Sequence, residues 1–146
     1  MLRENRLKYG AKGANLLVLQ KVLAQLAETK FASIANCVCI PEFELVPGSL
    51  YEKWLTGEDI TPELESIYEK VKSWKGPLAV RSSAVYSEDG ETMTGAGIYD
   101  SKFTQHPSPS FEEFSQAVCT VYESCESEKR NNIAKKTVSK KKSWAS

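Results

Sequence analysis

The chain has 146 residues, of which 41% are hydrophobic and 26% charged, and its formal net charge is zero. This length and composition are typical of one globular domain and exclude a fibrous or wholly disordered chain. No apolar run approaches the roughly 20 residues of a membrane span, and no apolar signal-peptide core follows the N-terminus, so we expect a cytoplasmic protein.

Charge is distributed unevenly along the chain. Residues 127–146 contain seven basic residues and one acidic residue, which gives this segment a net charge of +6 and leaves residues 1–126 with −6. The apolar pattern ends near Glu126. We therefore expect a folded body over residues 1–126 and a basic, disordered tail over residues 127–146. Such a tail can also bind nucleic acid without sequence preference, which is one alternative function.

Apolar spacing predicts the elements at the start of the body. Ile34–Ile40 is predicted to be a strand that ends at Pro41, and residues 43–46 are predicted to continue in extended form. Residues 12–28 are predicted to form a helix, because apolar side chains recur there at helical spacing and form one stripe: Leu16, Leu19, Val22, Leu23 and Leu26.

Capping residues predict three further helices. Ser49 is the expected N-cap of a short helix. Thr61-Pro62-Glu63 combines a cap residue, a proline at the first helical position and an acid in the first turn. Ser110 and Glu113 have the spacing of a capping box at the start of a last helix.

A hairpin is predicted between the last two of these helices. Leu78–Val80 reads as its first strand, and the segment near Phe103 as its second. The connecting residues 85–96 are polar and contain glycine, and they are more numerous than a simple turn requires. Long loops on rigid strands often carry function, so we expect a functional loop here.

The strand Leu78–Val80 leads directly into Arg81, Ser82 and Ser83. Arginine offers a planar fork of charged donors and serine adds short hydroxyl donors, so this strand end is suited to bind phosphate. An arginine at the end of an apolar strand also requires a partner, because an unpaired buried charge is costly. That partner is either a phosphate or an acidic residue of the loop 85–96.

A second phosphate-binding candidate lies near the N-terminus. Lys12 stands between Gly10 and Gly13, in or just before the first turn of the predicted helix 12–28, where the helix dipole favours an anion. The glycine spacing is not that of a P-loop. Lys12 is therefore either a phosphate ligand or an ordinary solvated lysine.

The other reactive side chains form no catalytic constellation in the sequence. The loop carboxylates Glu88, Asp89 and Glu91 are either magnesium ligands or solvated residues. His106 has no nucleophile or acid at catalytic spacing and is interpreted as a surface residue. The cysteines lack zinc-site spacing and are interpreted as reduced, mostly buried thiols: Cys37, Cys39, Cys119 and Cys125.

Four segments together resemble the N-terminal ATP-binding region of the phosphoenolpyruvate synthase and pyruvate phosphate dikinase family. The most specific is Leu78–Ala84 with its Arg-Ser-Ser core, and the match spans about residues 8–126. The supporting segments are Gly10–Leu16, Ile40–Phe43 and Thr94–Asp100.

The resemblance implies an α+β fold, namely the first lobe of an ATP-grasp-like domain with a mixed or antiparallel sheet and flanking helices. It further implies that Lys12 and Arg81 bind the phosphates of ATP, with Mg2+ neutralising charge during phosphoryl transfer. The remaining implied nucleotide-binding residues shape the strand end (Ser82 and Ser83) or lie in a loop that closes over the triphosphate (Thr94, Gly95 and Gly97).

Two features depart from the family pattern. Ala11 replaces a usual glycine, and the second ATP-grasp lobe, the phosphohistidine domain and the substrate domain have no counterpart in these residues. The resemblance therefore implies an incomplete, truncated ATP-binding fragment that binds ATP weakly or undetectably alone, and it leaves open whether the chain is itself an enzyme. The alternative is a non-catalytic interaction module that completes an ATP site in trans.

Overall fold

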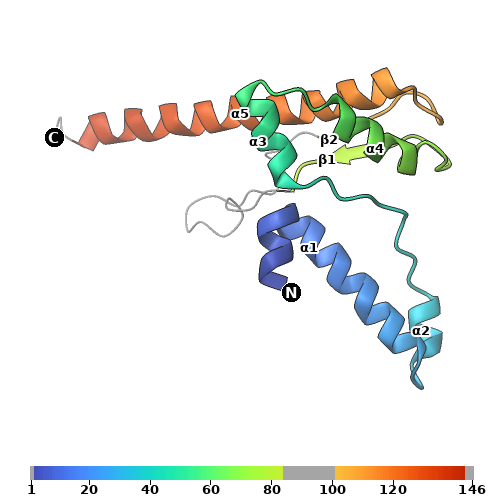
Figure 1. Ribbon diagram of the computed structural model, residues 1–146. Helices are drawn as coiled ribbons and strands as arrows, with labels where there is room; N and C mark the ends of the chain where they lie inside the picture. The colour runs from blue at the N-terminus through green and yellow to red at the C-terminus, as the bar shows by residue number, and fades with distance from the viewer. Residues whose placement is uncertain (1, 84–100, 144–146) are drawn as a thin grey trace. The chain divides into compact units, whose positions relative to one another are not determined.

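The computed structural model describes the backbone of residues 2–83 and 101–143, and the side chains of residues 3–83 and 101–127. These residues form an α+β structure that is mostly helical, with one small two-stranded sheet (Figure 1). The chain divides into two compact units. The N-terminal unit comprises residues 1–74 and 83–94, and the C-terminal unit comprises residues 75–82 and 95–146.

Helix α1 (Leu2–Ala27) opens the N-terminal unit and is broken at Gly10, whose φ of 74° and ψ of 175° are not helical. The part after the break corresponds to the predicted helix over residues 12–28, which is thus confirmed. The predicted apolar stripe is not buried, however. Leu19 and Val22 are both 41% exposed, and the three other stripe residues are only half-buried.

Helix α2 (Ala32–Asn36) stands where a strand was predicted over Ile34–Ile40, so that prediction is wrong. In the preceding turn, the hydroxyl of Thr29 accepts a hydrogen bond from the Phe31 N–H at 3.1 Å and the Thr29 carbonyl accepts one from Ala32. The run has no strand partner among the described residues, and α2 packs against α1. The two nearby cysteines are exposed, which corrects the expected burial of Cys37 and Cys39.

Helices α3 (Gly48–Thr56) and α4 (Thr61–Val71) also belong to the N-terminal unit. The N-cap of α3 is Pro47 instead of the predicted Ser49, and Gly57 ends the helix in the left-handed conformation. The start of α4 is confirmed, although the Asp59 carboxylate accepts the Thr61 N–H at 2.9 Å in place of a cap by Thr61 itself. The buried apolar residues of this region are Leu50, Ile60, Leu64, Ile67 and Val71.

The C-terminal unit is built from two short strands and one long helix. Strands β1 (Ala79–Arg81) and β2 (Ser101–Phe103) pair antiparallel, with Arg81 opposite Ser101, which confirms the predicted hairpin. Helix α5 (Phe111–Ser143) packs on both strands. The buried apolar residues of this unit are Leu78, Phe114, Ala117, Val118 and Val121.

Helix α5 does not end at Glu126, where the apolar pattern ends, but continues to Ser143. The backbone of residues 127–143 is therefore helical. Lysine, which occurs six times over residues 127–143, is a good helix former even without an apolar stripe. Among the described helices, none is long and apolar enough to cross a membrane.

Candidate functional site

Within the N-terminal unit, Ser83 meets the two glycines that flank Lys12 in the sequence through what we call the Gly–Ser contact, which consists of Gly10, Gly13 and Ser83. At Gly10 the chain passes so close to Ser83 that a Cβ atom would lie 2.0 Å from the Ser83 carbonyl oxygen and 2.5 Å from its Oγ. No real Cβ approaches other atoms so closely. Only glycine therefore fits at this position, for reasons of space as well as of backbone conformation.

The hydroxyl of Ser83 caps the helix that resumes after Gly10. Its Oγ accepts a hydrogen bond from the Gly13 N–H at 3.0 Å, across 70 residues of sequence. The first N–H groups of a helix have no acceptor within the helix. The Ser83 hydroxyl provides the acceptor for one of these groups, the N–H of Gly13. A Cβ on Gly13 would lie 3.1 Å from both a Leu45 methyl and the Tyr9 Cβ, so this glycine also permits close packing.

Lys12 lies between the two glycines of the Gly–Ser contact, in the first turn after the break in α1, and is exposed. The adjacent Ala11 is buried with 8% exposure. Its methyl group is therefore part of the packing of the unit.

Arg81 is the last residue of strand β1 and is exposed. The expectation of a buried arginine that requires a partner for its charge is therefore corrected. Ser82 follows it and is half-buried. Arg81 and Ser82 belong to the C-terminal unit, whereas Lys12 and Ser83 belong to the N-terminal unit. The predicted loop residues Thr94, Gly95 and Gly97, and the loop carboxylates Glu88, Asp89 and Glu91, lie outside the described residues.

A polar cluster that sequence analysis missed connects β2 to α5. Glu113 accepts hydrogen bonds from the backbone N–H groups of Gln105 and His106 through Oε1, and its Oε2 lies 2.9 Å from Nδ1 of His106. The predicted capping box is half confirmed, because the Glu113 N–H donates to the Ser110 hydroxyl at 3.2 Å. The glutamate side chain, however, holds the preceding turn instead of bonding back to Ser110.

The same turn is held from its other side by Thr104, which is 4% exposed. Its hydroxyl accepts the Leu78 N–H at 2.8 Å and lies 3.3 Å from the carbonyl of His106, to which it donates. His106 itself is exposed, in agreement with its interpretation as a surface residue. Its contacts with Glu113 and Thr104 secure a turn.

Glu113→Gln is expected to lower the melting temperature near neutral pH. Hydrogen bonds from His106 and from the backbone of Gln105 and His106 hold the pKa of Glu113 below its ordinary value. A depressed carboxyl pKa contributes stability above the unfolded pKa of about 4.3, and that contribution disappears as the pH falls through the folded value. The difference between wild type and variant should therefore shrink in acid.

The matched control is Glu112→Gln, which removes an exposed charge from the same first turn of α5. Thermal melts of the three proteins between about pH 3 and pH 7 test the expectation. Equal melting temperatures for the two variants at neutral pH would contradict the role given to Glu113.

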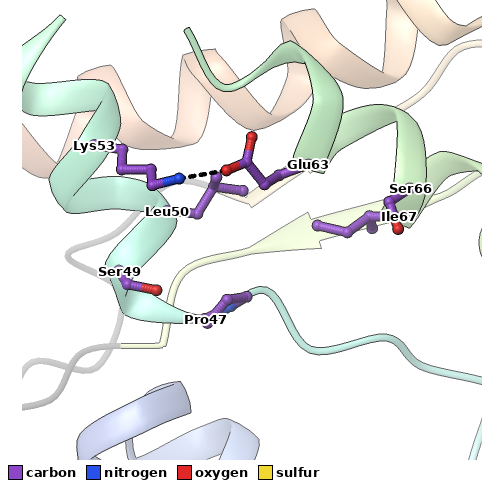
Figure 2. A pocket seen from close by; sticks show the side chains of 7 residues that line it. All are labelled: Pro47, Ser49, Leu50, Lys53, Glu63, Ser66 and Ile67. Atoms are coloured by element: carbon purple, nitrogen blue, oxygen red, sulfur yellow. Dashed lines mark hydrogen bonds and ion pairs between the residues drawn. The ribbon is translucent and has the colours of Figure 1, made fainter. Parts of the chain in front are cut away.

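A small pocket lies between α3 and α4, and Figure 2 shows its lining. Its volume is about 230 Å³, below the roughly 300–1,000 Å³ of ligand sites. Its two charged residues neutralise each other, because Lys53 Nζ lies 2.5 Å from Glu63 Oε1. This hydrogen bond raises the pKa of Lys53 and lowers that of Glu63. The ion pair in this pocket therefore serves mainly to link α3 to α4.

Within the described parts of the chain, no three histidine, cysteine or acidic side chains gather closely enough to hold a metal ion. Comparison with known proteins finds no protein-family model, curated protein or solved structure that matches the chain. The Gly–Ser contact is the strongest candidate for a functional feature. It brings Ser83, from one segment predicted to bind phosphate, against Gly10 and Gly13 of the other.

Proposed function

We propose that this chain is the phosphate-binding part of an ATP-dependent phosphotransferase of the dikinase type, with an ATP-grasp-like first lobe. In this proposal Lys12 and Arg81 bind the phosphates of ATP, Ser82 and Ser83 shape the strand end, and the loop containing Thr94, Gly95 and Gly97 closes over the triphosphate. Mg2+ accompanies the nucleotide. Phosphoryl transfer requires mainly positioned positive charge, which lysine and arginine supply.

One observation carries the proposal, namely the 3.0 Å hydrogen bond from the Gly13 N–H to the Ser83 hydroxyl. It joins the residue after Lys12 to the residue two positions after Arg81. The two segments are far apart in the sequence, and composition alone gives no reason for them to meet. The exposure of Lys12 and of Arg81 also supports the proposal, since a phosphate ligand must reach solvent in the free protein.

Titration of the 15N-labelled chain with ATP and Mg2+, followed by NMR, tests the proposal. We expect weak binding, in the millimolar range, with shifts concentrated at the amides of Lys12, Gly13 and Arg81. Lys12→Ala and Arg81→Ala should each weaken binding at least about tenfold, because a hydrogen bond to a charged group is worth about 1.5–3 kcal/mol.

The matched control is Lys21→Ala, which removes another exposed lysine of α1 and should leave the affinity unchanged. Adenosine, which has no phosphate, should produce none of these shifts. Shifts that are equal for ATP and adenosine, or that survive both alanine substitutions, would refute phosphate binding at these residues.

A second candidate function is an interaction module that completes an ATP site in trans. It is favoured by the exposed large apolar side chains of the N-terminal unit, which include Phe31 at 46% and Ile34 at 56% exposure in addition to Leu19 and Val22. Exposed apolar groups of this kind often mark protein contacts. The same titration separates the two candidates, because a module that depends on a partner shows no ATP-dependent shift by itself.

A further inference from the structure

We propose that Ser83 is a positioning residue of this site, whose hydroxyl holds the turn that carries Lys12 and does not itself bind phosphate. The inference deepens the proposed function and rests on it. Sequence analysis grouped Ser83 with the nucleotide-binding residues, and its contacts assign it a different task.

The first argument is the hydrogen bond made by the Ser83 hydroxyl. Its Oγ already accepts the N–H of Gly13, the residue that follows Lys12. That N–H belongs to the first turn after the break in α1 and is one that a bound anion could otherwise use. Because the Ser83 hydroxyl accepts the hydrogen bond from the Gly13 N–H, the backbone next to Lys12 is fixed by a contact within the protein and needs no bound anion.

The second argument is the steric contact on the other side of Lys12. Two residues before the lysine, Gly10 packs against the carbonyl carbon and oxygen of Ser83, so closely that a Cβ would lie 2.5 and 2.0 Å from them. Ser83 therefore touches the chain both before and after Lys12. A turn fixed at both ends by one residue cannot shift without moving that residue.

The third argument is burial. Gly10, Ala11, Gly13 and Ala14 are all buried, whereas Lys12 in their midst is exposed. A single charged side chain thus extends from an otherwise packed turn. When the backbone at Lys12 is fixed, the lysine side chain loses less conformational entropy on binding an anion. This smaller loss increases the affinity.

The test combines two measurements on the full chain, namely the hydrogen exchange of the Gly13 amide without nucleotide and the affinity for ATP with Mg2+. Ser83→Ala should speed exchange of this amide and weaken ATP binding, each about fivefold, as expected for loss of one capping hydrogen bond. Ser83→Thr, which keeps the hydroxyl, should restore both. Ser33→Ala, which alters an exposed serine of α2, is the control and should change neither.

Each other outcome overturns the inference in a recognisable way. Weaker ATP binding with unchanged Gly13 exchange would make Ser83 a direct phosphate ligand. Faster exchange with unchanged affinity would make it purely structural. In the wild-type protein, loss of Gly13 protection on adding ATP would show that the nucleotide displaces the serine, and this measurement needs no variant. Absence of any ATP-dependent shift in the wild type would refute the proposed function and this inference with it.

Discussion

Gly10→Ala is expected to lower the free energy of unfolding of the N-terminal unit by about 3 kcal/mol or more. The φ of 74° and ψ of 175° at this residue lie in a region that essentially only glycine adopts, at a cost of about 1–3 kcal/mol for other residues. The added methyl group would also lie 2.0 Å from a backbone oxygen of Ser83, which cannot turn aside as a side-chain tip can. Urea denaturation measures the loss.

Gly57→Ala is the matched control for this prediction. Gly57 ends α3 with a φ of 77°, yet nothing lies within 4 Å of the position that its Cβ would occupy. This variant suffers backbone strain alone and should lose about 1–2 kcal/mol. The excess loss in Gly10→Ala then reports the contact with Ser83 together with the more restrictive backbone conformation of Gly10. Equal losses in the two variants would mean that the Gly–Ser contact does not form in solution.

Leu64→Ala is expected to have the second large effect, a loss of about 2–5 kcal/mol in the free energy of unfolding. Leu64 in α4 is 2% exposed and is the largest fully buried side chain of the described residues. Its truncation removes apolar burial and leaves a cavity that the surrounding helices fill only in part. Denaturation in urea again gives the loss, with tryptophan fluorescence as the signal.

Leu55→Ala provides the comparison for Leu64. Leu55 lies in α3 but is 43% exposed, so truncation should change stability by only about 0.5 kcal/mol. If the two leucine variants lost the same small amount of stability, the assignment of Leu64 to the core of its unit would be wrong.

Several parts of the fold could be predicted because their signals are local. Pro62 at the first turn of α4 places that helix start, since proline lacks the N–H that would be unpaired there. Ser110 likewise marks the start of α5 through a hydrogen bond three residues ahead. The strand at Val80 follows from its apolar neighbours and from the Gly76-Pro77 break before it.

Other predictions failed because the deciding interaction was not local. A short apolar run such as Ile34–Ile40 fits a strand or a helix, and a strand forms only where a neighbouring strand can pair with it. The described residues pair β1 with β2 and offer no partner to this run, which adopts α2 over its first residues. The partner of His106 was also missed, because Glu113 was expected to bond back to Ser110.

The sequence by itself determined the starts of α4 and α5 and the pairing of the two strands, because residue type and spacing over a few positions carry that information. Only the tertiary structure decided the structural roles of Gly10 and Gly13. A glycine in a sequence permits many conformations, and its purpose depends on which distant chain approaches it. Here Ser83, 73 residues after Gly10, occupies the space that a side chain would need and binds the N–H beside Lys12.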